Sequence, residues 1–160
     1  MPAAGLLLLR LVLAVVLAMH GSHILFGTAA GEGAGPGGIA ATTAYFASIG
    51  LVPAVVFAVV SGGFRLIGSV LVAFGYLTRP MAGALLILDC LEIWKDSARW
   101  GFFLNAVNDP TRGNGLEYGF LMAGVLVCLV LAGAGDWSID GRRANSAAAR
   151  AAGRARLRRP

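Results

Sequence analysis

The stretch from Leu51 to Pro80, LVPAVVFAVVSGGFRLIGSVLVAFGYLTRP, decides the fold. Its apolar part, Leu51–Leu77, is long enough to cross the roughly 30 Å hydrocarbon core of a bilayer, since a helix rises about 1.5 Å per residue. Only one charge, Arg65, interrupts it. The segment Thr78-Arg79-Pro80 that follows is too short to do anything but reverse the chain. We therefore expect a membrane-spanning helix that turns directly into an antiparallel partner.

Further apolar runs flank this hairpin on both sides. They cover about residues 6–26, 80–95 and 116–134. A cleaved signal peptide is the rival interpretation of the first run, but its apolar part would span only about 7–15 residues. Leu6–Phe26 is longer and carries His20 and His23, so we expect a retained helix. Residues 1–140 are thus predicted to form an all-α, polytopic membrane protein, an antiparallel four-helix transmembrane bundle.

The composition supports lipid as the solvent for most of this chain. Apolar residues make up 58% of it and charged residues 13%. Soluble domains carry about 45–50% apolar and about 25% charged residues. Too little polar surface remains to cover a soluble globule, and soluble function classes are excluded on that ground.

The net charge of +5 is concentrated in the C-terminal tail. Residues 141–160 hold seven arginines and no acid. We expect this tail to be disordered. We also expect it to be cytoplasmic, because positively charged segments next to membrane helices stay on the cytoplasmic side. Four spans then put both termini on the cytoplasmic side of the cell (plasma) membrane. Beside a membrane, such a tail favours anionic membrane lipid or topology control over nucleic acid.

Ionisable side chains from all four predicted helices are expected to meet in the outer half of the membrane. They are His20, His23, Arg65, Asp89, Glu92 and Glu117. Counting from the cytoplasmic ends places Arg65 and Glu92 at the same height, about 18 Å up. A charge at the bilayer centre costs roughly 2.5–3.5 kcal/mol on insertion scales. We therefore predict an ion pair between Arg65 and either Asp89 or Glu92.

Two interpretations of this cluster remain open. The charges either hold the helices together, or they line a pocket for a lipid headgroup, a quinone ring or a proton relay, since intramembrane ionisable groups often mark function. In the second case His20 and Glu117 are the candidate catalytic residues and would handle protons. No metal-ligand motif of the HExxH kind is present, so no metal site is predicted.

A second, structural contact is expected at the cytoplasmic side. Arg10 lies one turn into the first helix, and Asp136 and Asp140 follow the last one at the same level. An ion pair between Arg10 and one of these carboxylates would fix the first helix to the end of the fourth.

Several short motifs, in their order and spacing, resemble the DoxX family of small four-helix membrane proteins. They are Arg10 with His20–Gly27, Tyr45–Leu51, Gly75–Arg79, Gly101-Phe102-Phe103, Glu117-Tyr118 and Gly133–Asp140. The chain departs from the family pattern at Ile24, where a lysine is usual, at Arg65, where an acid is usual, and at Ser97, where a histidine is usual. The resemblance covers most of residues 10–140.

The resemblance implies a role in membrane redox chemistry. Members of the family are subunits of thiosulfate:quinone oxidoreductase, of a terminal quinol oxidase and of a membrane oxidoreductase complex. It therefore implies a quinone-linked membrane subunit, with quinone as the cofactor and a partner protein or a second copy of the chain as the partner. The alternative is a non-catalytic anchor or assembly subunit that docks a partner on the loop of residues 95–115. A small-solute transporter is a weaker third reading.

Overall fold

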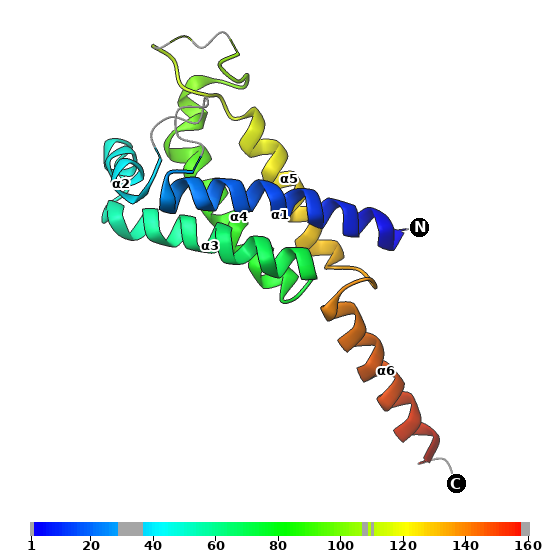
Figure 1. Cartoon of the computed structure of the whole chain (residues 1–160). Helices are drawn as coiled ribbons and strands as arrows, with labels where there is room; N and C mark the ends of the chain where they lie inside the picture. The colour runs from blue at the N-terminus through cyan, green and yellow to red at the C-terminus, as the bar shows by residue number, and fades with distance from the viewer. Residues whose placement is uncertain (1, 29–36, 107–108, 110, 158–160) are drawn as a thin grey trace.

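The computed structural model describes residues 2–28, 37–106, 109 and 111–157, and this part of the chain is helical, without strands (Figure 1). Its elements are α1 (Pro2–Phe26), α2 (Ile39–Ser48), α3 (Ala54–Phe74), α4 (Thr78–Lys95), the short 3-10 helix η1 (Ser97–Trp100), α5 (Glu117–Ala132) and α6 (Ile139–Leu157). The predicted apolar helices correspond to α1, α3, α4 and α5, each within a few residues of its expected bounds.

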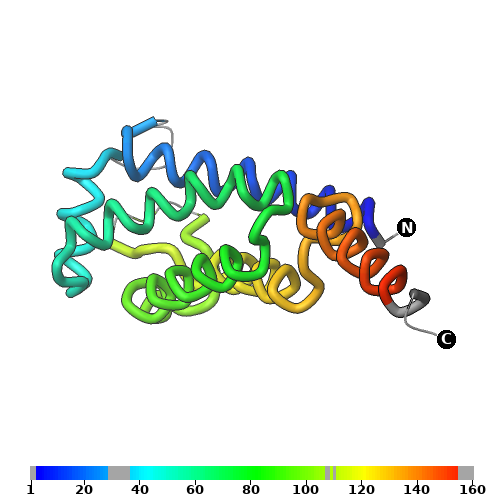
Figure 2. The backbone as a smooth tube through the Cα atoms, turned by 90° about the horizontal axis from the view of Figure 1, so that it is seen from below, coloured from blue at the N-terminus to red at the C-terminus, as the bar shows by residue number. Residues whose placement is uncertain are grey.

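The four apolar helices, α1, α3, α4 and α5, run in alternating directions and pair in two layers (Figure 2). α1 packs along α3, α4 packs along α5, and the tight α3–α4 hairpin joins the two pairs. The N-terminus of α1 and the helix α6 lie at the same end of the molecule (Figure 2). The short helix α2 lies at the opposite end and packs on the beginning of α3.

Two of these helices have the length and composition of membrane spans. They are Ala3–Phe26 in α1 and Ala54–Phe74 in α3, whereas α5 is apolar but shorter. Large apolar side chains on the outer faces are exposed, among them Leu8 at 64%, Ile67 at 60% and Leu131 at 73%. Soluble monomers rarely expose apolar surface so widely. The fold is therefore that of an all-helical membrane protein.

The apolar core fills one half of the bundle. It is built from Leu13, Leu17, Val72, Ala82, Leu85, Leu126 and Leu129, most of which lie on the halves of the helices nearest the α3–α4 turn. A smaller core forms under α2, around Phe46 and Leu51.

The C-terminal tail differs from its sequence prediction. It was expected to be disordered, but residues 139–157 form the helix α6, which projects from the bundle (Figure 1). Alanine and arginine have high intrinsic helix propensity, which accounts for a helix without tertiary packing. The described side chains after Gly141 are exposed.

The predicted ion pair of Arg10 is not formed. Arg10 is fully buried, and its Nη2 donates to the carbonyl oxygen of Trp137 at 2.7 Å. Among the described residues, neither Asp136 nor Asp140 lies within salt-bridge distance of it. Asp136 is exposed at this end of the chain. Backbone groups compete with charged side chains for hydrogen bonds, and here the Trp137 carbonyl takes the guanidinium in place of a carboxylate.

Asp140 instead caps the beginning of α4. Its carboxylate accepts hydrogen bonds from the amides of Leu77 at 3.1 Å and Thr78 at 2.9 Å, and its own amide donates to the Gly75 carbonyl at 2.9 Å. A carboxylate at a helix N-terminus also interacts favourably with the helix dipole. The contact joins the α3–α4 turn to the beginning of α6.

We expect Asp140→Ala to lower the stability of the folded chain by about 1–2 kcal/mol, the usual effect of losing an N-terminal cap. Thermal unfolding in detergent, followed by circular dichroism, measures the change. Asp136→Ala is the matched control, since its exposed carboxylate makes no hydrogen bond in the described part of the chain. Equal stability of the two variants would contradict the cap.

Candidate functional site

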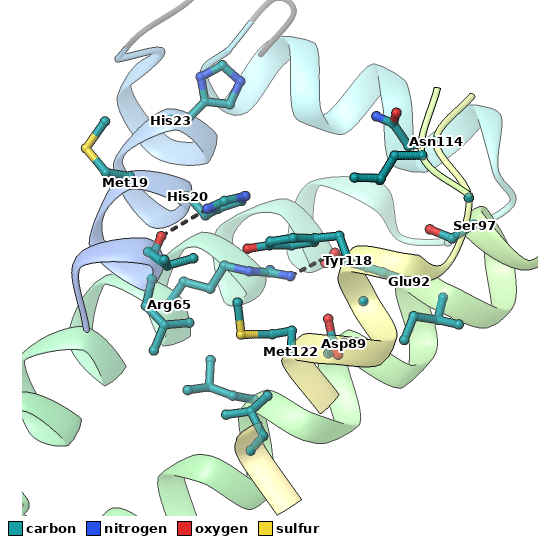
Figure 3. A pocket seen from close by; sticks show the side chains of 18 residues that line it. Met19, His20, His23, Arg65, Asp89, Glu92, Ser97, Asn114, Tyr118 and Met122 are labelled. Atoms are coloured by element: carbon teal, nitrogen blue, oxygen red, sulfur yellow. Dashed lines mark hydrogen bonds and ion pairs between the residues drawn. The ribbon is translucent and has the colours of Figure 1, made fainter. Parts of the chain in front are cut away.

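A cavity of about 560 Å³ opens between α1, α4 and α5 (Figure 3). It forms where α1 and α5 do not pack closely against each other, although both contact the rest of the bundle. Its polar lining consists of His20, His23, Arg65, Asp89, Glu92, Ser97, Asn114 and Tyr118. Its apolar wall includes Leu17, Met122 and Leu126. Five of the six residues expected to converge are therefore gathered around one cavity.

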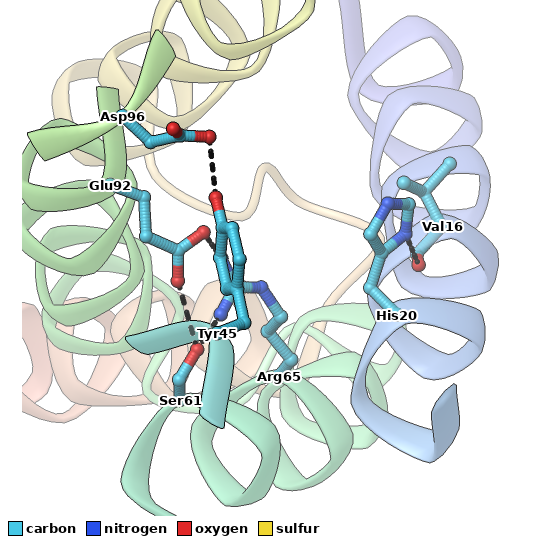
Figure 4. Close-up of polar contacts among 7 residues, drawn as sticks. All are labelled: Val16, His20, Tyr45, Ser61, Arg65, Glu92 and Asp96. Carbon is cyan, nitrogen blue, oxygen red and sulfur yellow. Dashed lines mark hydrogen bonds and ion pairs between the residues drawn. The ribbon is translucent and has the colours of Figure 1, made fainter. Parts of the chain in front are cut away.

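The predicted ion pair of Arg65 is present, and its partner is Glu92. Arg65 Nη2 lies 2.7 Å from Glu92 Oε2, with Arg65 buried and the Glu92 side chain 31% exposed (Figure 4). Ser61, one turn before Arg65, accepts a hydrogen bond from Arg65 Nη1 and donates to Glu92 Oε1 at 3.0 Å. The three side chains form a closed network between α3 and α4.

Asp89 lies one turn before Glu92 on α4 and is only 9% exposed. Within the described part of the chain, its Oδ2 has no hydrogen-bond partner. A Cβ added at Gly119 would lie 4.0 Å from Asp89 Oδ1, so the absence of a side chain there brings α5 close over this carboxyl. A buried polar group without a partner is unfavourable. Asp89 is thus suited to exchange a proton or to contact a ligand in the cavity.

Two rings stack beside the cavity. His20 of α1 and Tyr118 of α5 have centroids 5.6 Å apart and an interplanar angle of 13°. His20 Nδ1 lies 2.9 Å from the Val16 carbonyl oxygen (Figure 4). A carbonyl accepts only, so Nδ1 is the donor in this contact, and Nε2 is the ring nitrogen left for another partner. His23 makes a similar contact, with Nδ1 2.7 Å from the Thr28 carbonyl oxygen.

Glu117 does not join the cluster. It is exposed in the first turn of α5, and its Oε2 accepts a hydrogen bond from the Leu104 amide at 3.2 Å. It is not among the residues that line the cavity. The carboxylate therefore fastens the loop before α5, and the structure does not bring it together with His20.

Ser61 and Tyr118 take part in the site but were not predicted as site residues. Ser61 stands four residues before Arg65, the spacing that places two side chains on one helix face. Tyr118 follows Glu117 at the beginning of α5 and was noted only as part of a motif. Both local patterns can be found in the sequence. Neither one predicts a cavity, because the sequence does not show that α1 and α5 are apart at this place.

A further contact fixes the end of the bundle that lies opposite the α3–α4 turn. The Tyr45 hydroxyl of α2 donates to Asp96 Oδ2 at 2.5 Å, and Asp96 Oδ1 pairs with Arg99 Nη2 at 2.6 Å. Desolvation and then the hydrogen bond to Asp96 raise the pKa of Tyr45 above its ordinary value. The tyrosine therefore stays protonated and donates at neutral pH. The contact fastens α2 to the end of α4.

Comparison with known proteins gives one match. A family model described as DoxX matches residues 5–94, which include the cavity residues His20, Arg65, Asp89 and Glu92. No curated protein and no solved structure matches the chain. Among the described residues, no group of three histidine, cysteine, aspartate or glutamate side chains is placed to hold a metal ion.

Proposed function

The chain belongs to the DoxX family, and from this premise we propose that it is an integral membrane subunit of a redox system that binds a quinone in the cavity between α1, α4 and α5. In this proposal α1, α3, α4 and α5 all cross the plasma membrane as an antiparallel four-helix bundle. The arginine-rich α6 supports a cytoplasmic position for the end that carries both termini, because positively charged flanks of membrane helices favour that side. The cavity then opens in the outer half of the membrane.

The shape and lining of the cavity carry the proposal. Its volume of about 560 Å³ lies within the range of about 300–1,000 Å³ typical of small-molecule sites. The stacked rings of His20 and Tyr118 offer flat surfaces, and Met122 adds an apolar wall. A quinone needs this combination, because its ring packs on flat apolar surface while its two carbonyl oxygens accept hydrogen bonds or protons.

Protonation is the chemistry that these residues would supply. Reduction of a quinone to a quinol takes two electrons and two protons, which add to the two oxygens. In the proposal the electrons come from a redox partner protein. The protons pass through Asp89 and His20, whose free Oδ2 and Nε2 are described above. The network of Arg65 with Glu92 fixes the electrostatic environment beside them.

Quinone binding by the purified chain in nanodiscs tests the proposal. We expect saturable binding of a short-chain ubiquinone, and we expect Tyr118→Leu to weaken it by about two- to tenfold, since aromatic stacking contributes about 0.5–1.5 kcal/mol. Tyr76→Leu is the matched control, because Tyr76 lies in the α3–α4 turn away from the cavity. Absence of binding by folded wild-type chain would refute a quinone site in this cavity.

A partner-docking role is the second candidate, and one observation favours it. Phe102 and Phe103, in the loop after η1, are 49% and 69% exposed. Arg112 holds this loop through hydrogen bonds to the carbonyls of Trp100 at 3.1 Å and Phe103 at 3.2 Å. Loss of a co-purifying partner in Phe103→Ser, with quinone binding by wild type absent, would favour an anchor subunit.

A further inference from the structure

The four arginines of α6 whose side chains the structure describes lie on one side of the helix. At 3.6 residues per turn, the basic residues occupy about one third of the circumference. They are Arg142, Arg143, Arg150 and Arg154. The other side carries alanines, among them Ala144, Ala148, Ala151 and Ala152. All of these side chains are exposed, so α6 presents a basic face and an alanine face that the rest of the chain does not cover.

Contacts at the beginning of α6 determine where the basic face points. The Asp140 amide donates to the Gly75 carbonyl at 2.9 Å. The guanidinium of Arg143 lies over the ring of Tyr76, 4.7 Å from its centroid. Gly75 and Tyr76 form the α3–α4 turn, where two apolar helices end. The basic face is therefore turned toward the end of the apolar bundle, and the alanine face is turned away from it.

We propose that this basic face binds the anionic phospholipid headgroups of the membrane leaflet next to the α3–α4 turn. Guanidinium groups pair well with phosphate, because their planar donors match its oxygens. A shallow groove between the arginines is lined by Ile139, Arg142, Arg143, Ser146, Ala147 and Arg150. The proposal rests on α6, on its contacts with the α3–α4 turn and on the position of the bundle in the membrane given under the proposed function, and it is independent of the quinone site.

The composition of α6 specifies the kind of contact. Helices that insert at a membrane interface carry large apolar residues on the face opposite their charges. Here that face is alanine, so the attraction is electrostatic and acts at the surface of the headgroups. Such binding is screened by salt, since the Debye length falls to about 3 Å at 1 M ionic strength. We therefore expect binding of α6 to the membrane to weaken when salt is added, and also when the anionic lipid is replaced by neutral lipid.

Spin labels on the two faces test the proposal in the full chain. A nitroxide at Ser146→Cys reports the basic face, and one at Ala148→Cys reports the alanine face. Both are placed in a chain with Cys90→Ala and Cys128→Ala, since the two native cysteines are exposed. Accessibility to a water-soluble nickel chelate is measured in phosphatidylcholine nanodiscs, and again in nanodiscs that contain phosphatidylcholine and phosphatidylglycerol in equal parts.

We expect the label at position 146 to be shielded only in the anionic nanodiscs, and the label at 148 to stay accessible in both. Each arginine near an anionic surface contributes about a fivefold preference. The pair Arg150→Gln and Arg154→Gln should therefore reduce the ratio of bound to free helix by about 25-fold. Circular dichroism confirms that the variant keeps its helix.

Two results would overturn the proposal. One is equal accessibility of the label at position 146 in neutral and anionic nanodiscs. The other is shielding of that label by a short DNA duplex in neutral nanodiscs, without shielding by phosphatidylglycerol, which would assign the basic face to nucleic acid.

Discussion

Arg65→Met is expected to lower the stability of the folded chain by about 3 kcal/mol, because it leaves Glu92 in the bundle without its cation. The Arg65 side chain is 11% exposed and the pair is 2.7 Å long, so solvent screens the interaction little. Ser61 contributes to the same network and would also lose a partner. Reversible unfolding in mixed micelles, followed by circular dichroism, measures the difference in free energy.

A second variant separates the loss of a partner from the loss of packing. Replacing both members of the pair, as Arg65→Met with Glu92→Leu, should recover most of the stability, since it leaves no unpaired charge. The matched control is Arg99→Met. Arg99 is paired with Asp96 at 2.6 Å but is 55% exposed, so its loss should cost less than about 1 kcal/mol. An equal effect of the two single variants would contradict a buried pair.

The position of the Arg65 pair was predictable because few groups can balance a charge at that depth. Counting residues along each helix placed Glu92 at the height of Arg65. The sequence did not distinguish Glu92 from Asp89, since both lie on one face of α4. The choice depends on Ser61, whose hydroxyl bridges Arg65 and Glu92 and leaves Asp89 without a partner in the described part of the chain.

The failed contact predictions share one physical cause. Sequence reasoning paired charges with charges, but the connections between helices and the helix ends present backbone amides and carbonyls that compete for them. Arg10 bonds to a carbonyl, Asp140 bonds to the amides at the beginning of α4, and Glu117 bonds to the amide of Leu104. Trp137 and Leu104 lie in connections between helices, and Thr78 lies at the beginning of α4. Arg65 and Glu92 lie inside α3 and α4, where the backbone amides and carbonyls are already hydrogen-bonded within each helix. Their side chains therefore pair with each other.

The helices themselves followed from apolar run length, but the cavity did not. It depends on α1 and α5 separating where His20 and Tyr118 face each other, and no periodicity in either helix predicts that separation. The helical state of residues 141–157 was missed for a different reason. Their charge was interpreted as disorder, although alanine with arginine favours a helix even where nothing packs on it.

Gly21→Ala is expected to destabilise the chain by about 1–3 kcal/mol, the range for overpacking a tight interface. A Cβ at position 21 would lie 2.6 Å from the backbone nitrogen of Leu66 and 2.9 Å from the carbonyl oxygen of Gly62. Both atoms belong to the backbone of α3, which cannot move aside as a side chain can. The added methyl group must therefore push α1 away from α3. In the wild-type chain, the two helices approach closely at this position because glycine has no side chain.

In an isolated helix, alanine is more favourable than glycine by about 1 kcal/mol, so helix propensity alone predicts that Gly21→Ala is stabilising. A loss of stability must therefore come from the contact between α1 and α3. Gly63→Ala is the matched control, since nothing lies within 4 Å of a Cβ there, and it should be neutral or stabilising. His20 precedes Gly21, so displacement of α1 should also disturb its stacking on Tyr118. We therefore expect quinone affinity to fall in Gly21→Ala and to be unchanged in Gly63→Ala. If Gly21→Ala is as stable as Gly63→Ala, the close contact between α1 and α3 is wrong, and the position of His20 beside the cavity loses its support.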